Sequence, residues 1–172
     1  KGPVDLFFVE FAVNDDQDAA HSRTDCIRGM EGIVRHTRLH NPNADIVMTF
    51  FVNKAMLATC RKGEVPLTSG AHRAVAKHYN IPTIDLAQET ADQINAGTLT
   101  WKQFGGCHPK PIGNRLCVNL IERVMDRAWK EPLGPDAKPA PHPLPKIMDE
   151  KSYVRGTLVE PAAATAVSGM KV

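Results

Sequence analysis

One run of residues near the N-terminus constrains the fold more than any other feature of the sequence. Residues 4–13 read VDLFFVEFAV, so the run is apolar except at Asp5 and Glu10. A strand that is apolar on both faces is typical of a parallel sheet with helices packed on each side. The run therefore predicts a central strand over residues 4–13, buried on both faces.

Further along the chain, apolar strands alternate with amphipathic helices. A helix is expected from about Thr24 and ends before Pro42, because proline disfavours helical geometry in the residue before it. The other expected elements are strands over 45–52 and 83–86 and helices over 69–79, 88–96 and 113–129. This alternation predicts an α/β fold, a three-layer α/β/α sandwich of flavodoxin-like appearance with a parallel sheet. Three strands are few for such a sheet, so we expect the fold to be incomplete at the N-terminus and completed by sequence preceding Lys1.

The composition of the chain changes after Trp129. Residues 131–147 are rich in proline and are expected to form an extended linker after a domain spanning residues 1–130. Residues 148–172 are expected either to begin a further β module or to pack as a tail. Lysine and arginine total 21 and aspartate and glutamate total 19, with no basic cluster, so nucleic acid is not an expected partner. No apolar run approaches the ~20 residues that cross a bilayer, so no membrane partner is expected either.

Two loops carry reactive side chains at positions where an α/β sheet binds ligands, beyond the carboxyl ends of its strands. The first is Asn14-Asp15, directly after the first strand. A side-chain amide there can donate a hydrogen bond to an oxyanion, although Asn-Asp is also ordinary turn chemistry. The second is Gly105-Gly106-Cys107-His108-Pro109, which displays His108 on a restricted loop. His108 is thus a candidate general base or a solvent-facing loop histidine.

Together these two loops resemble blocks three and five of the SGNH (GDSL-like) hydrolases. In that family the asparagine of a Gly-x-Asn-Asp block donates to the oxyanion, and the histidine of an Asp-x-x-His-Pro block activates a serine. By position these roles fall on Asn14 and His108. The stretches FVEFAVNDD, TWKQFGGCHP and PIGN are similar to a subgroup that often carries β-rich modules and is linked to carbohydrate deacylation. The resemblance runs from Val4 to about Trp129 and identifies residues 1–130 as the C-terminal part of such a domain.

The sequence departs from the family pattern at three points. Ala12 replaces the glycine of the asparagine block, and Gly105 stands where the family has the aspartate that orients the histidine. His108 therefore needs another partner, for which Asp15 is the foremost candidate beside Asp16, Asp18, a backbone carbonyl or a group outside the chain. No Gly-Asp-Ser block occurs, and Ser69 is expected near the start of a helix as a cap. The nucleophilic serine is accordingly expected upstream of Lys1.

Other residues are weaker candidates for a role at the site. His21 and Asn53 each follow a strand, so both are possible substrate contacts. Glu10 is a carboxylate inside an apolar strand and is expected to form a structural ion pair. Four scattered cysteines without Cys-x-x-Cys spacing are expected to be unpaired thiols, and no metal site is expected.

The resemblance implies a serine esterase or acylhydrolase that deacylates a carbohydrate ester and needs no metal or organic cofactor. It also favours a secreted or periplasmic location. One rival is a non-catalytic carbohydrate-binding or scaffold protein that keeps the fold. Another is a small-molecule binding α/β domain in which Asn14 and Asp15 only shape a loop.

Overall fold

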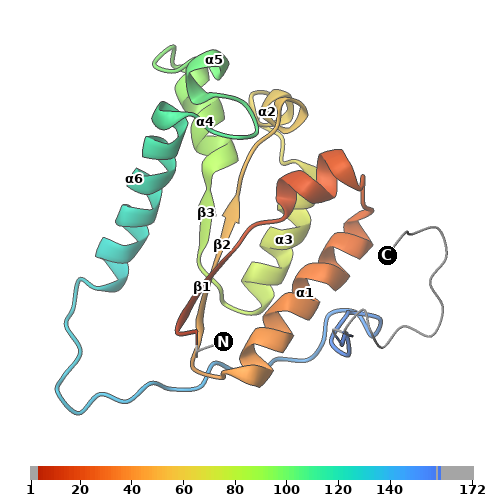
Figure 1. Ribbon diagram of the computed structural model, residues 1–172, viewed down its shortest axis with the longest axis vertical. Helices are drawn as coiled ribbons and strands as arrows, with labels where there is room; N and C mark the ends of the chain where they lie inside the picture. The colour runs from red at the N-terminus through yellow and green to blue at the C-terminus, as the bar shows by residue number, and fades with distance from the viewer. Residues whose placement is uncertain (1–3, 158, 160–172) are drawn as a thin grey trace, which may run out of the picture.

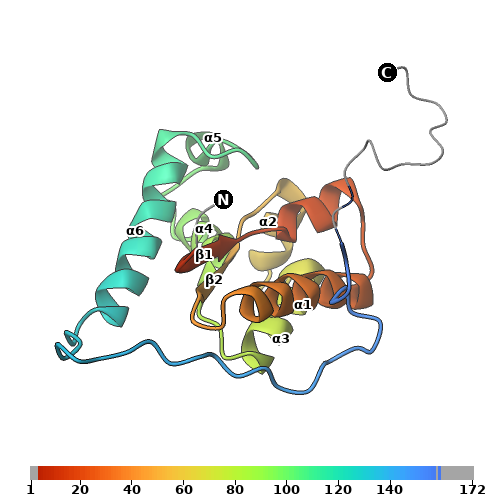
Figure 2. The same ribbon diagram turned by 60° about the horizontal axis from the view of Figure 1, so that its bottom comes forward.

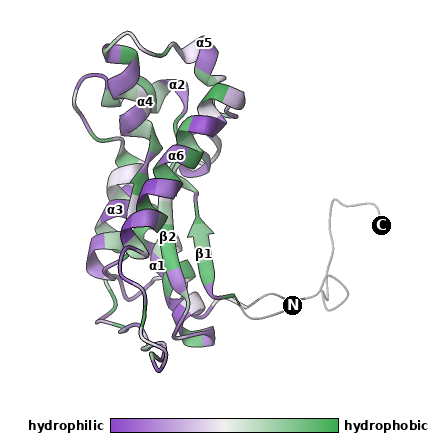
Figure 3. Ribbon diagram, turned by 90° about the vertical axis from the view of Figure 1, so that its left-hand side faces the viewer, coloured by the Kyte–Doolittle hydropathy of each residue, from purple (hydrophilic) through white to green (hydrophobic). Residues whose placement is uncertain are grey.

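The chain forms a parallel three-stranded sheet between two layers of helices (Figure 1). The computed structural model describes residues 4–157 and 159. The elements are β1 (Leu6–Val9), η1 (Asn14–Asp18, a π-helix), α1 (Arg23–His40), β2 (Asp45–Phe50), α2 (Lys54–Cys60), α3 (Leu67–His78), β3 (Thr83–Asp85), α4 (Leu86–Asn95), α5 (Trp101–Phe104) and α6 (Pro111–Ala128). Figures 1 and 3 show α1 and α3 on one side of the sheet and α6 on the other. The predicted α/β/α sandwich with a parallel sheet is confirmed.

The sheet has the order β1-β2-β3, with Leu6 opposite Asp45 and Met48 opposite Thr83. β2 is the buried centre: in the six-residue strand only Asp45 is exposed. It packs between the two helical layers and contributes Ile46, Met48 and Phe50 to the core. The strand expected over residues 45–52 is therefore present, although it ends at Phe50, and five of its six residues are buried.

The prediction of one long strand over residues 4–13 is wrong in its extent. β1 ends at Val9, because the Glu10 carboxylate accepts hydrogen bonds from the backbone N–H groups of Ala12 at 2.9 Å and Val13 at 3.4 Å and turns the chain into a helix. Among the described residues β1 pairs only with β2 and therefore lies at an edge (Figure 3). Leu6 is 40% and Phe8 38% exposed there. A central position for β1 requires another strand on its open side and stays a prediction.

The long helices lie within two residues of their expected bounds, whereas the short helices α2 and α5 were not expected. α2 begins directly after β2, where the side chain of Asn53 caps it by accepting a hydrogen bond from Met56 N at 2.9 Å. α5 is a single turn with a capping box between Thr100 and Gln103. Such short helices carry too little apolar periodicity to be recognised from sequence. In the described part of the chain, no helix has the length and apolarity that crossing a membrane requires.

A segment that we call the C-terminal strap, residues 142–157, lies along α1 and α3 (Figure 2). It has no helix or strand, and its carbonyl groups accept hydrogen bonds from basic side chains of these helices. Arg38 and Arg35 each donate at 2.9 Å, to Pro143 O and Pro145 O respectively. The strap includes the end of the expected linker and the start of the segment expected as a module or tail. Residues 160–172 of that segment lie outside the described residues.

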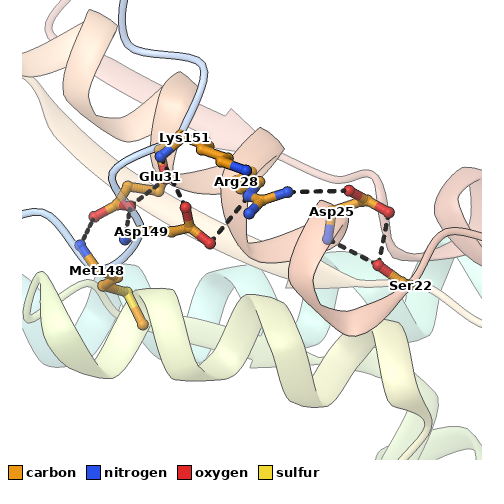
Figure 4. A network of polar contacts seen from close by, with 8 residues as sticks. Ser22, Asp25, Arg28, Glu31, Met148, Asp149 and Lys151 are labelled. Atoms are coloured by element: carbon orange, nitrogen blue, oxygen red, sulfur yellow. Dashed lines mark hydrogen bonds and ion pairs between the residues drawn. The ribbon is translucent and has the colours of Figure 1, made fainter.

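The strap is anchored at a buried carboxylate of α1, that of Glu31 (Figure 4). Its Oε1 accepts hydrogen bonds from Tyr79 Oη at 2.6 Å and Met148 N at 2.7 Å. Its Oε2 accepts from Asp149 N at 3.2 Å and from the hydroxyl of Ser152. Burial by itself raises the pKa of Glu31, but these four hydrogen bonds favour the ionised form and lower the pKa below its usual value. Glu31 is therefore a charged, fully hydrogen-bonded hub under the strap.

This hub makes the stability of the protein sensitive to acid. Because the pKa of Glu31 is lower in the folded chain than the ordinary value of 4.5, its contribution is fully present above about pH 4.5 and is lost as pH falls through the folded pKa. We expect Glu31→Gln to lower the free energy of unfolding by about 1 to 3 kcal/mol at neutral pH and to flatten its acid dependence. Urea unfolding between about pH 3 and pH 6 measures both effects.

The exposed carboxylate of Glu122 in α6 provides the matched control. Glu122→Gln should leave the acid dependence as in the parent. An equal flattening in both variants would mean that the dependence belongs to the overall charge and not to the strap anchor.

Candidate functional site

The segment that follows β1 is built around the Glu10 carboxylate. Besides the N–H groups of Ala12 and Val13, its Oε1 accepts a hydrogen bond from Phe51 N at 3.3 Å, so it ties the end of β1 to the end of β2. Burial raises the pKa of Glu10, and the three N–H donors oppose the rise. The expectation of a structural ion pair is wrong, because these partners are backbone amides and not cations.

Asn14 is the first residue of η1, and its side chain is exposed. Its neighbours face inwards: Ala12 is 0% and Val13 7% exposed. The segment after β1 and the loop between α5 and α6 lie at the same end of the sheet, beyond the carboxyl ends of the strands (Figure 1). Asn14, in η1, and His108, in the loop between α5 and α6, therefore lie at the end of the sheet where α/β proteins generally bind ligands.

Asp15 forms a close pair with a histidine that the sequence analysis did not single out. Its Oδ2 lies 3.0 Å from Nε2 of His72, which comes from α3 and is 1% exposed. Burial lowers the pKa of His72, and the neighbouring Asp15 carboxylate opposes this shift. A neutral His72 donates its Nε2–H to Asp15. The role of Asp15 as the acid that orients His108 stays a prediction, with one carboxylate oxygen already bound to His72.

Cys26 completes a cluster with Asp15 and His72. One ligand atom from each residue lies within 4.8 Å of the others, a spacing that could hold a metal ion. Burial, followed by the charge and hydrogen bond of Asp15, raises the pKa of the Cys26 thiol to about 11. One observation argues against a resident metal: His72 Nδ1 is buried without a partner in the described part of the chain, whereas metal-bound histidines normally donate from their second nitrogen. All four cysteines are free, as expected from their spacing.

Asn53 holds the other acidic side chain of η1. Its Nδ2 donates to Asp16 Oδ2 at 2.7 Å, while its Oδ1 caps α2. Asn53 is 6% exposed, so both ends of its amide are committed inside the protein. Asn53 therefore has a structural role. Its expected contact with the substrate stays a prediction.

His108 lies on a tight loop between α5 and α6, and its side chain is exposed. The loop is closed by a hydrogen bond of 2.8 Å from Lys110 N to Phe104 O. Gly105 ends α5 with a φ of 110°, and a Cβ there would lie 2.4 Å from Lys110 N. The aspartate that the family has at this position would not fit this loop. No hydrogen-bond partner of the His108 ring occurs among residues 4–157.

A cavity of about 880 Å³ lies beside β1, between α1 and the C-terminal strap. Its lining includes Asp15 and His72 at one end, His21 and His36, and apolar side chains including Phe7, Phe11, Met30 and Ile33. Among the expected site residues, Asp15 and His21 line it, whereas Asn14, His108 and Asn53 do not. The cavity therefore brings together only part of the expected site.

The three serines in the described part of the chain either form structural hydrogen bonds or are buried in a helix. Ser22 caps α1 by accepting from Asp25 N at 3.2 Å, and Ser152 donates to Glu31. Ser69 is 1% exposed inside α3, and its hydroxyl has no partner in residues 4–157; α3 has no side-chain cap, so the cap expected at Ser69 is wrong. Ser168 lies outside the described residues.

Sequence reasoning missed His72 and Thr68, which share one face of α3. Thr68 Oγ1 donates to Ala12 O at 2.9 Å, and both side chains are 1% exposed. The only available signal was the four-residue spacing of Thr68 and His72 shortly after Pro66, although the helix was expected to start only at Ser69. Polar residues at that spacing also occur on solvated helix faces, so the signal did not identify the contact.

Comparison with known proteins gives one family. The model of a family described as "GDSL-like Lipase/Acylhydrolase family" matches residues 1–116, which include both Asn14 and His108. Comparisons with curated proteins and with solved structures give no match.

Proposed function

Because the chain belongs to the GDSL-like lipase/acylhydrolase family, whose name describes ester hydrolases, we propose that it supplies the base and an oxyanion donor of a serine esterase. A serine attacks the acyl carbon of the ester while His108 takes the hydroxyl proton, which it then gives to the leaving alcohol, and the Asn14 amide donates to the tetrahedral oxyanion. Water, deprotonated by His108, then attacks the acyl-serine and releases the acid, and the serine recovers its proton. The observation that supports the proposal is that the family match includes both residues, whose exposed side chains come from segments beyond the carboxyl ends of the strands.

We further propose that the serine comes from sequence upstream of Lys1, within the same protein. β1 pairs on one side only among the described residues, and Leu6, Phe8 and Phe11 are 40%, 38% and 48% exposed. An open edge with this apolar surface favours pairing with another strand. The cavity beside β1 is lined by apolar side chains, and we propose that an upstream element, next to the strand that pairs with β1, fills it. In this arrangement the cavity is part of the domain core and not the substrate site.

A serine-directed fluorophosphonate probe tests the mechanism on the full-length protein. We expect covalent labelling of one serine outside residues 1–172, located by peptide mass spectrometry, together with loss of hydrolysis of p-nitrophenyl acetate. Labelling of Ser22, Ser69, Ser152 or Ser168 would contradict the upstream nucleophile. A full-length protein that is neither labelled nor active would instead support the non-catalytic carbohydrate-binding alternative.

The substrate that we propose is an acylated carbohydrate. Support comes from the similarity of FVEFAVNDD and TWKQFGGCHP to a subgroup linked to carbohydrate deacylation. Release of acetate from acetylated oligosaccharides, compared with hydrolysis of long-chain glycerides, tests this choice. Preference for the glycerides would replace the carbohydrate by a lipid ester and leave the serine mechanism unchanged.

A further inference from the structure

The backbone around Asn14 is held by more contacts than an ordinary turn requires. Ala12 N and Val13 N donate to Glu10, and Ala12 O accepts from Thr68. Asp15 is bound by His72 and Asp16 by Asn53. These contacts fall on both sides of Asn14, whose own side chain remains exposed.

Two of these contacts come from one helix. Thr68 and His72 are one turn apart in α3, which places their side chains on the same face. Thr68 binds the backbone before Asn14 at 2.9 Å, and His72 binds the side chain after it at 3.0 Å. Both donor residues are 1% exposed. α3 thereby grips the segment at two points that flank Asn14.

We infer that Thr68 and His72 are positioning residues that fix the Asn14 amide for oxyanion binding. The inference rests on the proposed role of Asn14. An oxyanion donor contributes most when it is held in place before the reaction, because no energy is then needed to reorient it in the transition state. The buried His72–Asp15 pair acts on Asn14 through the backbone and does not touch the substrate.

The test uses the full-length enzyme and two independent measurements. We expect His72→Leu, which removes the donor to Asp15, to lower kcat on p-nitrophenyl acetate by roughly ten- to a hundred-fold with KM changed by less than about threefold. Amide hydrogen exchange in residues 12–16 should become roughly ten times faster or more. His72→Gln keeps a side-chain N–H and should restore most of kcat and of the protection.

Thr68→Val removes only one hydroxyl and provides a milder variant if His72→Leu does not fold. It should lower kcat by roughly three- to ten-fold, since it loses a single hydrogen bond. Tyr79→Phe is the matched control: it follows the other end of the same helix and also loses a buried hydroxyl, the one that bonds to Glu31 at 2.6 Å. It should lower stability without changing kcat.

Each outcome decides one part of the inference. Unchanged amide hydrogen exchange in residues 12–16 of both His72→Leu and Thr68→Val would show that α3 does not hold this segment in place. Faster exchange with unchanged kcat, or an equal loss of kcat in Tyr79→Phe, would overturn its role in positioning Asn14. If the parent enzyme hydrolyses no ester, the proposed function fails, and exchange alone still decides whether α3 holds the segment.

Discussion

Replacing His108 by alanine in the full-length enzyme should lower kcat for an activated ester by about three orders of magnitude or more, while the protein remains folded. The large loss is expected because the variant has no group to accept the proton of the nucleophilic serine. The fold should survive because the His108 side chain is exposed and its ring contacts no hydrogen-bond partner in residues 4–157. Steady-state kinetics and thermal unfolding measure the two quantities.

His40 provides a matched control for this substitution. It is exposed at the last position of α1 and belongs neither to the expected site nor to the lining of the cavity. His40→Ala should keep the kcat of the parent. If His108→Ala kept the turnover of the parent, the general base would be another residue. The loop from Gly105 to Pro109 would then not have the catalytic role that the family resemblance implies.

The second large effect is expected from Asn14→Ala. Loss of one oxyanion donor typically lowers kcat by roughly a hundred- to a thousand-fold. KM should change little, because the hydrogen bond strengthens only as negative charge develops on the substrate oxygen. Separate measurement of kcat and KM for p-nitrophenyl acetate tests this expectation.

Gln17 lies in the same short helix as Asn14 and is also exposed, so Gln17→Ala controls for general damage to η1. It should retain parental kcat. A rise in KM without a fall in kcat in Asn14→Ala would make Asn14 a substrate-binding residue, and equal losses in both variants would point to disruption of η1.

The patterns that predicted the fold correctly were long and local. Cys26, Met30 and Val34 repeat at helical spacing and are buried in α1, and residues 46–50, apolar except for Thr49, form the buried centre of the sheet. Such patterns predict structure well because an amphipathic helix must bury its apolar face, and a strand that is apolar on both faces must lie inside the sheet. Asn14 was readable as the polar end of the first apolar strand, and His108 was readable from the glycines and prolines around it.

The sequence by itself therefore determined the α/β/α class, the long helices and the family to which the chain belongs. Only the tertiary structure decided that Glu10 ends β1, that His72 binds Asp15, and that the strap packs on Glu31. Each of these contacts joins a buried polar group to a partner whose identity depends on the three-dimensional path of the backbone. A buried carboxylate or imidazole must find a hydrogen bond, but local sequence does not state which residue supplies it.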